Sequence, residues 1–282
     1  MYKIGLSTCS TPVTEEKFAA YRAAGLDFME ISDNIEGFAR LNYGEVRALS
    51  EKYAVKIWSM HLPFGPFNVL DLSNPATAAH TVEYCNELIK KGAEIGVDKF
   101  VFHPSGEPIK DEERGLRMET SKQSLAACAE FAAQYGAIIC VENLPRTCLG
   151  KNSAEIAELL SAHPALRACF DTNHLLAEDI VEFIHNLGEK IVTVHVSDYD
   201  FVNERHWLPG EGKIDWRAVI AALGEVGYSG PWMYEIELNC TRNIVRDRAF
   251  TYEDFVLNAK ELFAGKKPTV FSRPKPNLGF WE

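Results

Sequence analysis

The chain has 282 residues, of which 46% are apolar, and this length accommodates a single α/β barrel of about 250 residues with a large core. Its formal net charge is −11, which argues against a duplex-DNA partner because such proteins usually present a basic face. No apolar run approaches the roughly 18 residues that cross a bilayer, so we expect no membrane partner.

Short apolar segments rich in β-branched and aromatic residues recur along the chain, and we predict that each forms a strand. In chain order they cover residues 3–9, 28–32, 55–61, 99–103, 137–142, 167–171, 191–197 and 232–238. An amphipathic stretch follows each strand and predicts a helix. These helices cover residues 14–25, 43–53, 76–96, 111–135, 153–163, 179–188, 215–227 and 252–265.

The alternation of strands and helices suits both a (β/α)₈ TIM barrel and a doubly wound open sheet. Eight strands, and the lack of a G-x-G-x-x-G fingerprint after the first strand, favour the barrel. We therefore predict one α/β domain, a (β/α)₈ barrel over residues 1–265. Residues 266–282 contain three prolines and four basic residues, and we expect an extended tail packed on the barrel or on a partner subunit.

Six consecutive predicted strands, from the third to the eighth, end in residues of the types that commonly bind metals. In a barrel these positions converge on the C-terminal mouth, where barrel active sites lie. Imidazoles and carboxylates together suit Zn²⁺, Mn²⁺, Fe²⁺ and Co²⁺. The residues are His61, His103, Glu142, Asp171 followed by His174, His195 and Glu235.

Each of these residues also has an ordinary structural interpretation. A single acidic residue at a strand end is usually a helix cap or a solvated loop residue, and a single histidine is usually a hydrogen-bonded core or surface residue. Six consecutive strands that all end in such a side chain weaken that interpretation. Glu237 lies two residues beyond Glu235 and faces the same way on a strand, so it belongs either to the site or to its rim.

The segment after the seventh strand reads NERHWLPGEGKIDW. The Pro209-Gly210-x-Gly212 run predicts a sharp bend, and Asp215 is placed to cap the next helix. Arg205 and His206 precede the bend and are expected to reach over the mouth. The aromatic residues near strand ends are expected to form walls of the pocket; they are Trp58, Phe64, Phe67 and Trp207.

The motifs VENLP, FDTNH, VHVSD, PGEGKIDW and YEIE resemble those of the xylose-isomerase-like barrel superfamily, in its sugar phosphate isomerase/epimerase branch. That branch includes ketose 3-epimerases, hydroxypyruvate isomerase and inosose dehydratase. The resemblance covers nearly the whole chain and is poor at naming a substrate.

In the epimerases, four side chains from the last four strands hold one divalent ion. The resemblance implies that Glu142, Asp171, His195 and Glu235 do so here, with Mn²⁺ or Zn²⁺ expected and Co²⁺, Fe²⁺ or Mg²⁺ as alternatives. It also implies that Glu142 and Glu235 are the catalytic acid/base pair. The expected substrate contacts are His61, His103, His174, Arg205 and His206.

The same superfamily contains the type IV AP endonucleases, which hold three zinc ions with nine ligands. Residues matching all nine positions exist in this chain, although one is altered. The nuclease pattern has Asp-x-His where this chain has Glu204-Arg205-His206, and the longer side chain argues against a three-metal cluster.

We therefore expect a metal-dependent isomerase or epimerase acting on a sugar or sugar phosphate, through a metal-stabilised enediolate and two glutamates. The alternatives are an AP endonuclease-like phosphodiesterase, an inosose dehydratase-like lyase, and a binding protein without turnover. The last is disfavoured by the complete ligand set.

The expected partner is a small sugar or polyol, with no nucleic acid and no membrane, while a homo-oligomer, as dimer or tetramer, is left open. The seven cysteines form no C-x-x-C pair, and the start MYKIGLSTCS is too polar for a signal peptide. Both features predict a reduced, cytoplasmic compartment.

Overall fold

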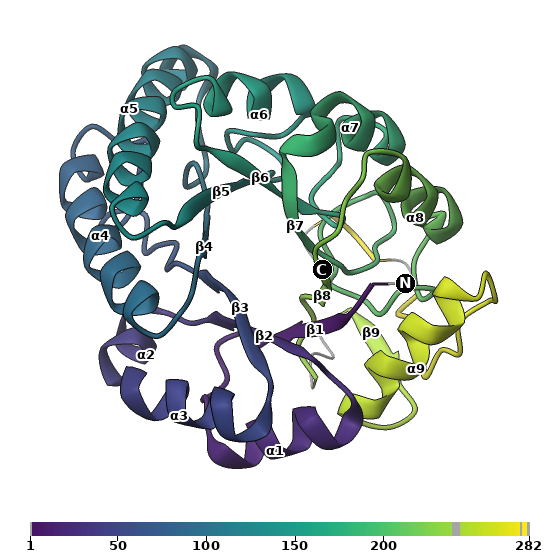
Figure 1. Cartoon of the computed structure of the whole chain (residues 1–282). Helices are drawn as coiled ribbons and strands as arrows, with labels where there is room; N and C mark the ends of the chain where they lie inside the picture. The colour runs from purple at the N-terminus through teal and green to yellow at the C-terminus, as the bar shows by residue number, and fades with distance from the viewer. Residues whose placement is uncertain (1, 239–242, 277, 281–282) are drawn as a thin grey trace.

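The computed structural model describes residues 2–238, 243–276 and 278–280. It contains a barrel of eight parallel strands with helices around the outside, as predicted (Figure 1). All eight predicted strands are present, but the eighth, predicted over residues 232–238, ends at Tyr234. The strands are β1 (Ile4–Ser7), β2 (Phe28–Ser32), β3 (Lys56–His61), β4 (Lys99–Phe102), β5 (Ile138–Glu142), β6 (Arg167–Asp171), β7 (Ile191–His195) and β8 (Trp232–Tyr234).

The strands follow one another around the ring in chain order, and β1 pairs with both β2 and β8. Between β7 and β8 the ring is joined by a parallel bridge just beyond β7, from Val196 to Tyr234. Here Val196 N–H donates to Met233 O at 2.8 Å, and Glu235 N–H donates to Val196 O at 3.2 Å. This bridge fixes the backbone of Glu235 at the mouth, although β8 itself ends one residue earlier.

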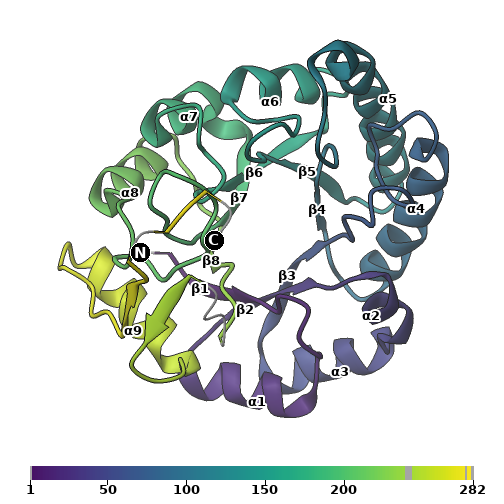
Figure 2. The same ribbon diagram turned by 180° about the vertical axis from the view of Figure 1, so that it is seen from behind.

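The eight predicted helices are also present and surround the strands (Figures 1 and 2). None of the helices in the described ranges is both long enough and apolar enough to cross a bilayer. A further helix, α2 (Ile35–Arg40), was not predicted because six residues are too few to show a helical period. The predicted helices are α1 (Glu15–Ala24), α3 (Tyr43–Tyr53), α4 (Ala78–Glu94), α5 (Arg114–Ala133), α6 (Ser153–Leu160), α7 (Ile180–Leu187), α8 (Trp216–Glu225) and α9 (Tyr252–Phe263).

The pairing of β2 with β3 contains a register shift, and the shift reverses which residues of β3 face the barrel interior. At the shift, Trp58 has no register partner on β2; it contacts Phe28 and donates its indole N–H to Thr193 Oγ1 at 3.1 Å. After it, the next residue, Ser59, lies opposite Glu30 and donates to Glu30 Oε2 at 2.7 Å. Adjacent residues therefore both point inward, as irregular pairing allows. A second shift lies between β6 and β7.

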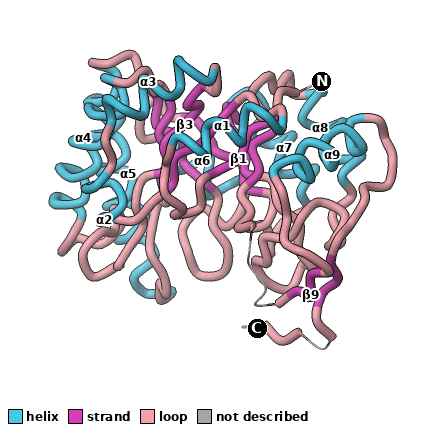
Figure 3. The backbone as a smooth tube through the Cα atoms, turned by 90° about the horizontal axis from the view of Figure 1, so that it is seen from below, coloured by secondary structure: helices cyan, strands magenta, loops and turns pink. Residues whose placement is uncertain are grey.

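The loops at the carboxyl ends of the strands gather at one end of the barrel, together with the C-terminal segment (Figure 3). Two short strands, β9 (Ile244–Arg246) and β10 (Ser272–Pro274), pair antiparallel there. Further on, Gly279 O accepts from the Arg205 guanidinium at 2.8 Å, and Phe280 O accepts from Asn203 Nδ2 at 2.5 Å. The tail thus lies against the loop after β7 of its own chain. Trp281 and Glu282 lie outside the described residues.

The loop after β7 is organised around the buried carboxylate of Asp198. This carboxylate accepts hydrogen bonds from Gly210 N at 2.7 Å, Ile214 N at 3.1 Å and Trp216 Nε1 at 2.9 Å. The predicted bend is present, and Asp215 caps α8 as expected. The backbone passes so close to Asp198 that a Cβ on Gly212 would lie 2.3 Å from Asp198 Oδ1.

We predict that Gly212→Ala lowers the free energy of unfolding by about 1–3 kcal/mol, because the new methyl group overlaps Asp198 and the backbone of the loop. Gly224→Ala is the matched control: a Cβ there meets nothing within 4 Å on an exposed face of α8, and we expect it to stabilise the chain by about 0.5–1 kcal/mol. Urea unfolding monitored by circular dichroism measures both. A Gly212→Ala midpoint at or above that of the unsubstituted protein would contradict this account of the loop.

Candidate active site and metal centre

Glu142, at the end of β5, is fully buried and accepts hydrogen bonds from three histidines. His195 Nδ1 lies 2.8 Å from Glu142 Oε1, and His61 Nε2 and His103 Nε2 lie 3.0 and 3.1 Å from Glu142 Oε2. Burial alone would raise the pKa of this carboxyl, but the three imidazoles hold the pKa well below its usual value. Glu142 therefore carries a negative charge in a site that excludes water.

Asp171 and Glu235 complete a group of four with Glu142 and His195. His195 Nδ1 lies 3.8 Å from Asp171 Oδ2 and 3.7 Å from Glu235 Oε2. One ligand atom from each of the four residues lies within 4.8 Å of all the others. The structure thus brings together all four residues that the sequence predicted as metal ligands, from the ends of four successive strands.

The chemistry of this group fits a divalent cation. Asp171 Oδ2 is buried and has no hydrogen-bond partner among the described residues, which is costly for a carboxylate oxygen. First-row cations bind oxygen and nitrogen at about 2.0–2.2 Å, so neighbouring ligand atoms lie roughly 3–4 Å apart. The distances from His195 Nδ1 to the three carboxylates are 2.8, 3.8 and 3.7 Å, which is close to that spacing. A cation would satisfy the unpartnered oxygen of Asp171.

The pKa values of the carboxyls also show that negative charge is crowded here. Burial raises the pKa of Asp171, and the nearby Glu142 carboxylate raises it further. Burial raises the pKa of Glu235 to about 7, with Glu142 and Asp171 adding to the increase and His195 opposing it. Each of these effects is what a divalent cation would relieve.

Asn143, which the sequence analysis did not single out, connects two of the motifs. Its side-chain oxygen accepts from Asp171 N at 2.8 Å, and its amide donates to Asp171 O at 2.9 Å. Its own carbonyl oxygen lies 2.9 Å from His174 Nδ1. Asn143 therefore aligns the end of β6 with the end of β5 and orients His174. The sequence feature that could have identified Asn143 is its position next to Glu142 in the VENLP motif.

His174 extends the site toward the loop after β7. His174 Nε2 lies 3.2 Å from Glu204 Oε2, and the other Glu204 oxygen lies 3.0 Å from Arg146 Nη1. Burial opposes protonation of His174, but Asp171 and Glu204 outweigh it and raise its pKa to about 10. Arg146 also pairs with Glu107. Arg146 and Glu107 were not predicted, because their loops meet only in the folded barrel.

A cavity of about 690 Å³ opens over this group at the mouth of the barrel, a volume typical of small-molecule sites. Glu235 is the only member of the four-residue group among the described lining residues; the other three form the buried floor. Four of the five predicted substrate contacts line the cavity: His103, His174, Arg205 and His206. The fifth, His61, is 1% exposed, lies against Glu142 and is not among the described lining residues.

The predicted contacts from the loop after β7 have further partners. His206 Nδ1 lies 3.1 Å from the backbone oxygen of Glu235 and 3.8 Å from its Oε2. The Arg205 guanidinium pairs with Asp200 at 3.0 Å and donates to Gly279 O. Arg205 therefore borders the cavity and also attaches the tail to it.

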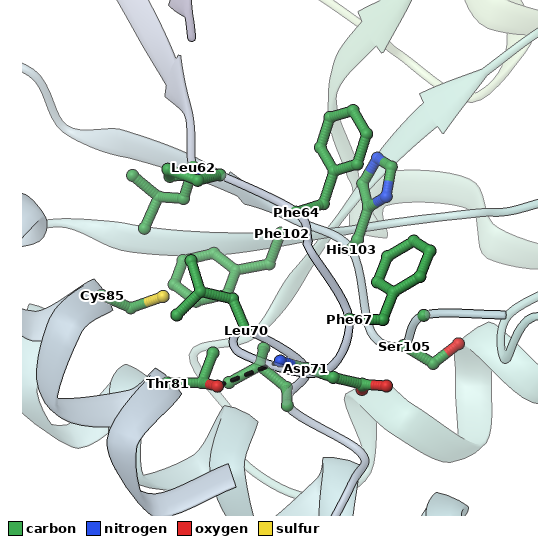
Figure 4. A pocket seen from close by; sticks show the side chains of 13 residues that line it. Leu62, Phe64, Phe67, Leu70, Asp71, Thr81, Cys85, Phe102, His103 and Ser105 are labelled. Carbon is green, nitrogen blue, oxygen red and sulfur yellow. Dashed lines mark hydrogen bonds between the residues drawn. The ribbon is translucent and has the colours of Figure 1, made fainter. Parts of the chain in front are cut away.

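Aromatic side chains form one wall of the cavity. The rings of Phe64 and His103 stack at 4.1 Å, and Phe67 lies beyond His103 (Figure 4). Behind them is a small pocket of about 20 Å³, which has room for a water molecule and none for a sugar. The expectation that Trp58 and Trp207 also line the pocket was wrong. Trp58 points into the barrel below the site, and Trp207 is buried against Asn243.

Glu30, in β2, is a further residue that the sequence analysis missed. It is fully buried, and its Oε2 lies 3.0 Å from His195 Nε2. No local pattern marks Glu30, because it stands inside a strand rather than at its end, two residues before Ser32.

Known proteins resemble this chain over most of its length. The family model described as xylose isomerase-like TIM barrel matches residues 18–253. The uncharacterized protein MJ1311 of Methanocaldococcus jannaschii is 28% identical over 214 residues, which cover 73% of this chain and 72% of that protein. Fructoselysine 3-epimerase of Escherichia coli O157:H7 is 26% identical over 146 residues, which cover 47% of this chain and 53% of that enzyme.

Solved structures show the same relationship. The crystal structure of a D-tagatose 3-epimerase-like protein matches with a TM-score of 0.79 and 25% identity, and covers 93% of this chain and 97% of that one. L-ribulose 3-epimerase shares the fold, with a TM-score of 0.72 and 22% identity over 84% of this chain and 82% of that one. Fold, motifs and family model agree, and the chain belongs to the xylose isomerase-like TIM barrel family.

Proposed function

We propose that this protein is a divalent-metal-dependent isomerase or epimerase that acts on a ketose or a closely related carbohydrate. The observation that carries the proposal is the convergence of Glu142, Asp171, His195 and Glu235 on one point at the floor of the cavity. Mn²⁺ and Zn²⁺ are the cations we expect there. A protein that only bound a sugar, without converting it, would not require four metal-ligand side chains at the floor of the cavity.

The similar proteins support a carbohydrate substrate. One curated relative is a fructoselysine 3-epimerase, and a structural neighbour is described as D-tagatose 3-epimerase-like. We take from them the reaction class, which is removal and return of a proton beside a carbonyl group. The sugar itself is not defined by these similarities.

A cation at this site would polarise the carbonyl and adjacent hydroxyl of a ketose and so acidify the neighbouring carbon–hydrogen bond. Glu235 borders the cavity with a partly exposed side chain, so its carboxylate can reach that hydrogen. Glu142 comes from a strand well separated from β8 around the ring. In this proposal one glutamate would remove a proton on one side of the substrate and the other would return a proton on the opposite side.

The histidines around the cavity would orient the substrate hydroxyls. Burial lowers the pKa of His103 to about 4, so this ring is neutral at physiological pH and can donate one hydrogen bond and accept another. His174 is held by Asn143 and Glu204, and His206 by the backbone of Glu235. Fixed donors of this kind place the reacting carbon between the glutamates.

The AP endonuclease-like alternative has one observation in its favour. His61, His103 and Glu142 form a second potential metal group, and His174, Glu204 and His206 form a third. The Arg146 guanidinium, however, lies 3.0 Å from Glu204, so a positive charge already borders the third group. The Arg146 guanidinium and the net negative charge of the chain both favour the carbohydrate enzyme over the nuclease. The dehydratase alternative begins with the same proton abstraction, and only the product distinguishes a dehydratase from an isomerase or epimerase.

We predict that the protein loaded with one equivalent of Mn²⁺ transfers solvent deuterium to the carbon next to the carbonyl group of at least one free ketopentose or ketohexose. Incubation of a ketose panel in D₂O, read by NMR and mass spectrometry, measures this exchange. The protein stripped with EDTA is the control and should recover its activity when Mn²⁺ is returned. Loss of water from an inosose, without exchange in any ketose, would favour the dehydratase instead.

We predict that Glu142→Gln and Glu235→Gln each reduce kcat by about 10²–10⁴-fold, since each removes a proton acceptor while keeping the size of the side chain. Glu237→Gln is the matched control, because Glu237 lines the same cavity and is not assigned to proton transfer. Its kcat should stay within a few-fold of the unsubstituted value. Circular dichroism checks that all three variants fold. Near-native kcat in either of the first two variants would refute the two-glutamate mechanism.

We expect no incision of an abasic DNA duplex at physiological salt, with either Zn²⁺ or Mn²⁺. Duplex binding depends strongly on Lys and Arg contacts to phosphates, and this chain has 40 acidic and 29 basic residues. Electrophoresis of a labelled oligonucleotide measures incision, with Asp171→Asn as the negative control. Cleavage by the unsubstituted protein but not by Asp171→Asn, with three metals bound per chain, would reverse the choice between the two functions.

A further inference from the structure

We propose that Glu30 is a positioning residue that holds the imidazole of His195 in the orientation and protonation state required to bind the cation. The inference rests on the proposed function in one respect, namely that His195 is a metal ligand. The inference gives a role to the buried carboxylate of Glu30, which takes no part in the proposed proton transfer.

The two nitrogens of His195 face different groups. Nε2 lies 3.0 Å from Glu30 Oε2, whereas Nδ1 lies on the side of Glu142, Asp171 and Glu235. An imidazole can coordinate a cation only through a nitrogen that carries no proton. Without a cation, Nδ1 donates to Glu142 Oε1 at 2.8 Å, and a cation would bind there only after this proton is released. Glu30, as the acceptor at Nε2, would keep the remaining ring proton on Nε2 and so leave the lone pair of Nδ1 directed into the group of ligands.

One oxygen of Glu30, Oε2, has a second partner besides His195, whereas Oε1 has no hydrogen-bond partner among the described residues. Ser59 Oγ donates to the same oxygen, Oε2, at 2.7 Å, and the register shift between β2 and β3 is what places Ser59 opposite Glu30. Both Glu30 and Ser59 are fully buried. A buried carboxylate is costly unless it is paired, and here the pairing fixes the plane of an imidazole.

The carboxylate also strengthens His195 as a ligand. A negatively charged acceptor at Nε2 increases electron density on the ring and makes Nδ1 more basic, which a neutral acceptor such as an amide does less effectively. The arrangement of carboxylate, histidine and cation therefore predicts that the charge of Glu30 matters for metal affinity, beyond its contribution to folding.

The test is the affinity of the full-length protein for Mn²⁺ and Co²⁺. We expect Glu30→Gln to weaken Mn²⁺ binding by about 10–100-fold and to shift the visible absorption of bound Co²⁺, because Nδ1 becomes a weaker ligand. Glu30→Asp keeps the charge but withdraws it from Nε2, and should weaken binding as well. Ser59→Ala should act in the same direction with a smaller effect. Calorimetry or electron paramagnetic resonance gives the affinities.

Two control variants change comparable groups whose hydrogen-bond partners are neither Glu30 nor His195. Asp254→Asn changes a buried carboxylate paired with Arg248, and Ser121→Ala removes a fully buried hydroxyl that donates to Pro104 O. We expect both to alter unfolding without changing the affinity for Mn²⁺. They separate a general loss of stability from a specific effect on the metal site.

The outcomes distinguish this inference from the proposed function. If the unsubstituted protein binds Mn²⁺ while Glu30→Gln and Glu30→Asp bind it equally tightly, Glu30 is only structural and the positioning role is wrong. If Glu30→Gln does not fold, Glu30→Asp and Ser59→Ala decide the question by the same measurement. If the unsubstituted protein binds neither Mn²⁺, Zn²⁺ nor Co²⁺, the proposed metal-dependent function fails first and this inference fails with it.

Discussion

The burial of Glu142 is the constraint on which the site depends. A carboxylate withdrawn from water is strongly destabilising unless donors surround it, and three histidines from β3, the end of β4 and β7 do so here. Each of those imidazoles must be oriented in turn. Glu30 faces the second nitrogen of His195, and the backbone oxygen of Leu62 lies 3.0 Å from Nδ1 of His61. One buried charge thus fixes the ends of several strands relative to one another.

The carboxylates of Asp171 and Glu235, in the same four-residue group, are less well compensated. Asp171 has a buried oxygen without a partner in the described part of the chain. Burial raises the pKa of Glu235, and the nearby carboxylates of Glu142 and Asp171 raise it further. Val101, Cys140 and Cys169, which stand two residues before His103, Glu142 and Asp171, form a small buried apolar cluster, in which the side chain of Val101 offers the carboxylates no hydrogen-bond donor. The surplus of buried negative charge, rather than any single residue, is the physical argument for a divalent cation.

The open side of the site is shaped by segments that are distant in sequence. Asp198 gathers the loop after β7, and that loop carries Glu204, Arg205 and His206 to the cavity. Arg205 then attaches the tail, so that Phe280 joins Phe64 and Phe67 among the lining residues. The surface that a substrate would meet is therefore built from the segments that follow all eight strands, together with the tail, over a floor set by the strands.

The sequence by itself determined the barrel and the four candidate ligands, because apolar segments that alternate with amphipathic ones force strand ends to converge, and polar residues at those ends stand out. Only the tertiary structure decided the roles of Glu30, Asn143 and Arg146. The register shift between β2 and β3 sets which side chains face inward, and no local pattern shows it. Arg146 meets Glu107 and Glu204 only where three loops come together. Strand periodicity is a local property of the chain, whereas register and loop contacts arise only when distant segments pack.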